Sequence, residues 1–239
     1  WSLGTKEHDA NPEWEALHKE FHKTLIENSS SRWLKEFSET KDKLLLTYHG
    51  KNGSEFEIES PYTGGYQIKN IKGILAWCEQ LVNQQILNLS LEHIKNGIKN
   101  ARNNTKLKGR WEILQHSPTM IADTAHNVSG LSELMHQIGK EKIDQLYIIL
   151  GMVADKDIQK VLSILPQHAK YIFTQANNPR ALSAIELQEL SKKSNLIGEV
   201  CKDVNEAISY VLSQATNKDF ILITGSTYLV AEIDNIWIE

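Results

Sequence analysis

Residues 119–130 read TMIADTAHNVSG, where an apolar run ends in Asp123 and a helical pattern begins near Val128. Such a run, followed by a polar turn and an amphipathic stretch, is typical of a β-strand that leads into an α-helix. Asn127 suits the N-cap of that helix, because its side chain can accept a backbone N–H hydrogen bond. A cap leaves Asp123 and His126 without an explanation, so both are candidate functional residues.

The same strand-then-helix rhythm continues along the rest of the chain. The predicted strands lie in the stretches WEILQ, TMIAD, QLYIILGMV, KYIFTQA, LIGEV and DFILITGS. The predicted helices begin near Val128, Asp157, Ser183, Asn205 and Thr227. Strongly apolar strands that alternate with helices predict a mostly parallel sheet with helices on both faces. We therefore expect an α/β fold of the Rossmann-like type.

The first hundred residues have a different pattern. Asn11 and Pro12 suit the start of an amphipathic helix, and two β-rich runs on either side of residues 50–53 predict a hairpin. Residues 66–84 and 91–103 predict two helices, and the polar stretch 103–110 predicts a linker. We expect two domains, 1–107 and 108–239.

Composition narrows the class of protein. The net charge is −4 with a pI near 6.2, so we expect neither nucleic acid nor a membrane surface as a partner. The longest apolar run, Leu146–Ala154, is too short to span a bilayer. Only Cys78 and Cys201 are present, which favours a reducing, cytoplasmic location. The chain does not begin with methionine, so we expect a piece of a longer protein.

Ligands of open parallel sheets bind beyond the carboxyl ends of the strands, and four polar clusters fall there. They begin at Asp123, Asp155, Asn177 and Gly225. We interpret the Asp155 and Arg180 clusters as ordinary helix-start chemistry, with Asp155 as an N-cap and Ser183 with Glu186 as a capping box.

The Asp123 cluster fits a nucleotide. A strand-end carboxylate such as Asp123 can accept ribose hydroxyls, and His126 enters a helix N-terminus, where anions are favoured. Arg110 adds a guanidinium that can contact phosphate at two points.

Other motifs are absent or weak. The chain contains neither G-x-G-x-x-G nor G-x-x-x-x-G-K-[ST], and it lacks G-x-S-x-G. His18 and His22 lie one helical turn apart, but no third ligand accompanies them, so we expect a solvated helix face and no metal ligands in this chain.

Six motifs in order give the chain a resemblance to the C-terminal portion of folylpolyglutamate synthase/dihydrofolate synthase, in the Mur ligase superfamily. They are GGYQIKN (64–70), KGRWEIL (108–114), IADTAHN (121–127), GMVADKDI (151–158), NNPRAL (177–182) and ITGSTYLVAE (223–232). The resemblance implies a remnant of the central ATPase domain (1–107) followed by the glutamate ligase domain (108–239). It also implies an ATP-dependent amide ligase that adds L-glutamate to dihydropteroate or folates through an acyl phosphate.

The resemblance also implies a role for particular residues. Asn70 and Gln67 match positions near the adenine, Arg110 matches an arginine on the ATP phosphates, and Asp123 matches the ribose ligand. His126 matches a histidine at the phosphates and the reacting centre. Ser226 and Tyr228 match positions linked to the incoming glutamate.

Some features depart from the family pattern. Thr124 stands where the family usually has glycine, and Val128 where it has proline. The P-loop and the Mg²⁺ ligands are expected upstream, so we predict that this chain alone is inactive and that the full-length protein is a monomer. Two alternatives remain: a non-catalytic binding module of the same fold, and a Mur-type ligase acting on cell-wall precursors.

Overall fold

The computed structural model describes residues 34–39, 43–49, 55–155 and 157–237. The chain divides into two compact units, Trp1–Thr105 and Lys106–Glu239, and each is described by itself. The predicted helix after Pro12, with His18 and His22, lies outside the described residues. No helix in the described ranges combines the length and apolar character needed to cross a membrane.

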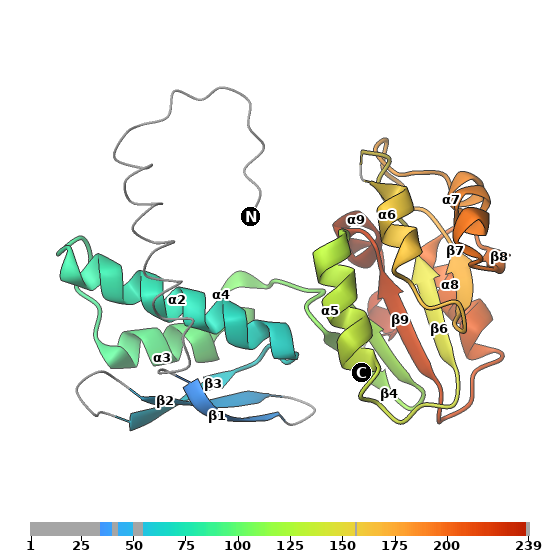
Figure 1. The fold of residues 1–239 in the computed structure, drawn as a ribbon. Coiled ribbons are helices and arrows are strands. Elements are labelled where there is room, and N and C mark those ends of the chain that lie inside the picture. Colours follow the sequence, from blue (N-terminus) through green and yellow to red (C-terminus); the bar gives the residue numbers. More distant parts are fainter. Residues whose placement is uncertain (1–33, 40–42, 50–54, 156, 238–239) are drawn as a thin grey trace, which may run out of the picture. The chain divides into compact units, whose positions relative to one another are not determined.

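The first unit is a three-stranded antiparallel sheet with helices packed against it (Figure 1). Its elements are β1 (Leu34–Glu39), β2 (Leu44–His49), β3 (Glu55–Ser60), α2 (Gly65–Asn83), α3 (Leu91–Lys99) and α4 (Ala101–Thr105). The predicted hairpin is confirmed in its strands, because β2 pairs antiparallel with β3 from Leu44 opposite Ser60 to His49 opposite Glu55. Its predicted turn, residues 50–53, lies outside the described residues.

Two features of this unit differ from the sequence-based expectation. Strand β1 was not predicted, because LKEFSE lacks the alternation of apolar and polar residues that marks a half-buried strand. Residues 103–105 were expected to begin a linker, but they complete α4. The Thr105 hydroxyl donates to the Ala101 carbonyl at 2.7 Å, which supports this last turn.

The core of the first unit is formed by the apolar side chains that recur along its strands and helices. Leu44, Leu46 and Ile58 point to one face of the sheet, as expected for alternating strand positions. Helices α2 and α3 cover that face with Ile71, Leu75 and Ile98.

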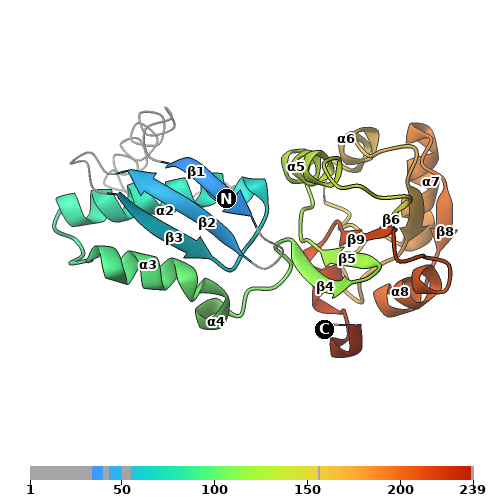
Figure 2. The same cartoon turned by 90° about the horizontal axis from the view of Figure 1, so that it is seen from below.

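The second unit contains a six-stranded sheet, which confirms the predicted mostly parallel fold (Figure 2). Its strands, in the spatial order β4-β5-β9-β6-β7-β8, are β4 (Glu112–His116), β5 (Thr119–Ala122), β9 (Phe220–Thr224), β6 (Leu146–Leu150), β7 (Lys170–Phe173) and β8 (Gly198–Val200). Among these described strands, only β4 runs antiparallel to its neighbour. The central strands β6 and β9 are buried throughout.

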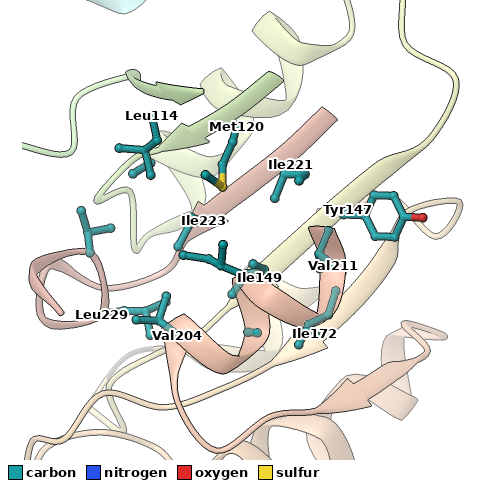
Figure 3. Packing of buried hydrophobic residues seen from close by; sticks show 14 of the residues in the cluster. Leu114, Met120, Tyr147, Ile149, Ile172, Val204, Val211, Ile221, Ile223 and Leu229 are labelled. Carbon is teal, nitrogen blue, oxygen red and sulfur yellow. The ribbon is translucent and has the colours of Figure 1, made fainter. Parts of the chain in front are cut away.

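Helices cover both faces of this sheet. They are α5 (Val128–Ile138), α6 (Ile158–Ser163), α7 (Ala184–Ser191), α8 (Val204–Leu212) and α9 (Thr227–Ala231), with short 3₁₀ turns at Lys192–Ser194 and Asn235–Trp237. Helices α5 and α6 lie on one face and α8 on the other (Figure 2). Figure 3 shows the α8 face, where Val204 and Val211 pack with Leu229 of α9 against Ile149 and Ile223.

Helix caps fix the point at which each strand-end loop turns into its helix. Asn127 caps α5 as predicted, because its Oδ1 accepts the Gly130 N–H at 2.9 Å. Ser183 caps α7 by accepting the Glu186 N–H at 3.2 Å. The expectation that Asp155 caps α6 was wrong, since Asp157 is the N-cap and accepts the Lys160 N–H at 3.3 Å. Asp155 forms an ion pair with Arg180 instead.

Candidate functional site at the carboxyl ends of the strands

The carboxyl ends of β5 and β9 bring several predicted site residues to one edge of the sheet. Strand β5 ends just before Asp123 and β9 just before Gly225, and the two strands are parallel neighbours. The Gly225 N–H and the Thr224 hydroxyl both donate to the Ala125 carbonyl, at 3.0 and 3.1 Å. The loop after β5 is therefore fastened to the end of β9.

Asp123 is buried at the end of β5, with 2% of its surface exposed. Its Oδ2 accepts the Trp111 N–H at 2.8 Å, and its Oδ1 accepts the Ala125 N–H at 2.9 Å. A carboxylate has about four lone-pair directions, so its two oxygens can accept donors besides these two. Asp123 holds two backbone segments in place, which the sequence pattern had not indicated.

Arg110 reaches the same strand end from the turn that precedes β4. Its guanidinium Nη1 donates to the Thr124 hydroxyl at 2.9 Å, and the Arg110 side chain is half-buried. Gly109, one residue earlier, has φ of +69°, a conformation that glycine adopts without steric cost. Arg110 and Asp123 therefore belong to one hydrogen-bonded assembly.

His126 lies at the entry to α5 and is half-buried. Its Nδ1 is 2.9 Å from the Thr124 carbonyl oxygen. Because a carbonyl can only accept, this contact is a hydrogen bond when Nδ1 carries the proton, and the tautomer with that proton has its lone pair on Nε2. His126 also lines an open depression of about 340 Å³ together with Asn127, Val128, Ser129, Asp157 and Val161. The first turn of α5 contributes the partial positive charge of its N–H groups to this depression, and Asp157 contributes a carboxylate.

Ser226 and Tyr228 follow β9. Ser226 is buried, and its hydroxyl accepts the Tyr228 N–H at 3.1 Å as the N-cap of α9. Tyr228 is 38% exposed, and its hydroxyl accepts from Arg180 Nη1 at 3.4 Å. Gly225 has φ of +106°, and a Cβ there would lie 2.6 Å from the Gly151 carbonyl oxygen, so only glycine fits this approach of β9 to β6.

Sequence reasoning missed the cluster formed by Asp155, Arg180 and Tyr228. Arg180 Nη2 donates to Asp155 Oδ2, and hydrogen bonds to Asp155 and then to Tyr228 raise the pKa of Arg180. The three residues follow β6, β7 and β9, respectively. Their shared position after strand ends is the sequence feature that could have predicted this cluster. The interpretation of Asp155 and Arg180 as helix-start residues is corrected by the structure, in which the two pair with each other across 25 residues of sequence.

Gln67 and Asn70 lie on α2 in the first unit, whereas the other predicted site residues belong to the second unit. Asn70 Nδ2 donates to Gln67 Oε1 at 2.8 Å, as the i, i+3 spacing on a helix allows. Gln67 is buried and Asn70 is exposed. Their predicted place near an adenine stays a prediction.

Within the described part of the chain, no group of three or more acidic, cysteine or histidine side chains could hold a metal ion. The donor set around Arg110 and His126 instead suits an anion, because it combines a guanidinium, an imidazole and helix N–H groups.

Fold and site together define an α/β domain whose candidate site residues lie at the carboxyl ends of the strands of a mostly parallel sheet. Residues 109–227 match the model of the Mur ligase, glutamate ligase domain. This match assigns the second unit to the Mur ligase superfamily.

Similar proteins agree with this assignment. The chain is 25% identical over 218 residues to folylpolyglutamate synthase of Lacticaseibacillus casei, which covers 87% of the chain and 49% of that protein. Its fold resembles that of Mycobacterium tuberculosis folylpolyglutamate synthase complexed with ADP and AMPPCP, with a TM-score of 0.70 at 20% identity over 87% of this chain and 48% of that one.

A second solved structure is a bifunctional folylpolyglutamate synthase/dihydrofolate synthase with Mn, AMPPNP and L-glutamate bound. It has a TM-score of 0.60 at 23% identity and covers 84% of this chain and 45% of that one. The chain therefore spans about half the length of these relatives, or less.

Proposed function

We propose that this chain forms the glutamate ligase half of an ATP-dependent ligase that adds L-glutamate to dihydropteroate or a folate. The observation that carries this proposal is the convergence of Arg110, Asp123 and His126 on the carboxyl end of β5. The nucleotides and glutamate bound by the similar structures support it.

In the proposed reaction, ATP phosphorylates the substrate carboxylate, and the glutamate amine then displaces phosphate from the acyl phosphate. This chain's part is to position groups and stabilise charge. Arg110 binds phosphate oxygens through its N–H groups, and the first turn of α5 adds backbone donors. His126, with its Nδ1 proton held by Thr124, presents Nε2 to the reacting groups. Asp123 keeps the Arg110 turn in place and accepts hydroxyl hydrogen bonds from the ribose.

The glutamate would bind beside β9. Ser226 and Tyr228 lie there, and Arg180 supplies the cation that a glutamate carboxylate requires. Gln67 and Asn70 on α2 would contact the adenine. A divalent metal, Mg²⁺ under cellular conditions, would neutralise negative charge on the ATP phosphates, and we assign its protein ligands to a part of the full-length protein outside these 239 residues.

The first test is a ligase assay on the protein in its complete natural length. Arg110→Ala, Asp123→Ala and His126→Ala should each lower glutamate- and folate-dependent ADP release by about a hundredfold or more, as loss of a charge-stabilising or proton-transfer group does. His116→Ala is the matched control, because His116 is exposed at the far end of the β4–β5 hairpin. Near-wild-type rates in all three site variants would refute the assignment.

We also propose that the 239 residues alone do not turn over ATP, because they contain no P-loop sequence. Purified 239-residue chain is mixed with ATP, Mg²⁺, glutamate and dihydropteroate. ADP release that depends on the presence of both glutamate and dihydropteroate would contradict this proposal.

A further inference from the structure

The turn that carries Arg110 has an unusual backbone. Gly109 has φ of +69° and Trp111 has φ of +49°. A positive φ is rare for a bulky aromatic residue and persists only where the surroundings hold it. Trp111 is 6% exposed and packs near Phe220, with ring centroids 6.2 Å apart. The direction of the Arg110 side chain therefore depends on whatever fixes this turn.

Thr124 contacts the turn through its backbone and its side chain. Its N–H and its hydroxyl both donate to the Gly109 carbonyl, at 2.9 and 3.1 Å. Its hydroxyl also accepts from Arg110 Nη1 at 2.9 Å. A threonine hydroxyl has one proton and two lone pairs, so it can make both bonds at once.

The methyl group of Thr124 packs against the same turn. A Cβ built on Gly109 would lie 2.6 Å from Thr124 Cγ2, so the methyl occupies the space that Gly109 leaves empty. Thr124 itself is 4% exposed. Its hydroxyl therefore makes these bonds in a site with little access to water, where a hydrogen bond to a charged group is strongest.

We propose that Thr124 is a positioning residue for Arg110. Its hydroxyl fixes one end of the guanidinium and leaves the other N–H donors of Arg110 for the nucleotide phosphates. This inference rests on the proposed function, in which Arg110 binds those phosphates. A residue without a side-chain hydroxyl at this position could not make this bond.

Two substitutions separate the hydroxyl from the shape of the side chain. Thr124→Val keeps the branched shape and removes the hydroxyl, whereas Thr124→Ser keeps the hydroxyl and removes the methyl. The dissociation constant for AMPPNP with Mg²⁺ is measured by calorimetry on the protein in its complete natural length. We expect Thr124→Val to weaken binding roughly three- to tenfold, as the loss of one hydrogen bond to a charged group does, and Thr124→Ser to restore most of the affinity.

A double-mutant cycle with Arg110→Ala distinguishes positioning from a general loss of structure. If Thr124 acts through Arg110, then Thr124→Val should cause no further loss of affinity in the Arg110→Ala background. An equal loss in both backgrounds, or no loss in either, would overturn the positioning role. If Thr124→Val does not fold, Thr124→Cys, whose thiol is a weak acceptor, takes its place in the cycle.

The same cycle separates failure of this inference from failure of the proposed function. If Arg110→Ala alone leaves AMPPNP affinity unchanged, Arg110 is not a phosphate ligand, and both proposals fail at that residue. If Arg110→Ala weakens binding while Thr124→Val does not, the phosphate role stands and the positioning role fails.

Discussion

The Trp111 backbone N–H donates to Asp123 Oδ2 at 2.8 Å and links the start of β4 to the end of β5. The other carboxylate oxygen accepts the Ala125 N–H at 2.9 Å. One buried side chain thus joins the turn before β4 to the loop after β5. The residue that was singled out from sequence for a ligand also holds its own site together, so stability and binding must be measured separately for its variants.

Asp123→Asn should destabilise the second unit. An asparagine side chain has one acceptor oxygen and one NH₂ group, so one of the two backbone N–H donors would face another donor. We expect the free energy of unfolding to fall by about 1–3 kcal/mol, the cost of an unsatisfied buried group. Urea unfolding, monitored by circular dichroism, measures this change in the free energy of unfolding. Asp144→Asn, at an exposed position, is the control, and equal effects of the two substitutions would contradict the prediction.

Gly109→Ala should destabilise the turn that carries Arg110. An alanine at φ of +69° is strained by about 1–2 kcal/mol, and its Cβ would lie 2.6 Å from Thr124 Cγ2. Adding Thr124→Ser removes that methyl, so the double variant should lose less stability than the sum of the two single variants. Thermal unfolding of the four proteins tests this coupling, and strict additivity would count against the contact.

Gly97→Ala should increase stability, in contrast to Gly109→Ala. Gly97 lies in α3 and is exposed, and a Cβ added there would meet no heavy atom of the described residues within 4 Å, apart from those of its own helical backbone. Alanine in a helix interior is favoured over glycine by about 0.5–1 kcal/mol. A higher urea midpoint for the first unit is the expected result, and a lower midpoint would show that the site is not an open helical surface.

Asn205→Ala should loosen the C-terminal segment. Asn205 Oδ1 accepts from the Asp234 N–H at 3.0 Å and from Trp237 Nε1 at 3.1 Å, while its Nδ2 donates to the Glu232 carbonyl at 2.9 Å. We expect a loss of about 1–3 kcal/mol and faster proteolysis after residue 232. The exposed Asn177 gives the control substitution to alanine. Unchanged proteolysis in Asn205→Ala would refute the role of Asn205 as an anchor.

Alkaline pH should destabilise the first unit partly through Tyr48. Burial, and then the nearby Glu79 carboxylate, raise the pKa of Tyr48 from 10.0 to about 12. Because the unfolded tyrosine ionises first, this contribution to stability is complete below pH 10 and is lost as the pH rises towards 12. Tyr48→Phe should therefore lose less stability between pH 9 and pH 11 in urea unfolding. An identical loss in wild type and variant would contradict the assignment, and Tyr210→Phe on α8 is the control.

The second unit was predictable because its local signals agree with its tertiary structure. Strands β5, β6, β7 and β9 are mainly apolar runs followed by polar turns, and the side chains of Asn127 and Ser183 cap the helices that they precede. Strand β1 could not be predicted, since its pairing with β2 and not its own pattern defines it.

The candidate site was predictable only in part. Their positions after predicted strands made Asp123, His126 and Ser226 candidates, because the carboxyl ends of parallel strands lie at one edge of the sheet. The partners of these residues come from distant sequence. Asp155 pairs with Arg180 and does not cap a helix. Thr124 accepts a hydrogen bond from Arg110, which lies 14 residues earlier in the sequence. No pattern within one window of sequence contains such contacts.

The two outer strands of the six-stranded sheet are poorly suited to pairing with another molecule. Strand β8 has only three residues, and β4 has a register shift between Ile113 and Gln115. Short or irregular edge strands are poor templates for the addition of a strand from another molecule. The sheet therefore ends in edges that discourage polymerisation, while its apolar central strands β6 and β9 stay enclosed between neighbours.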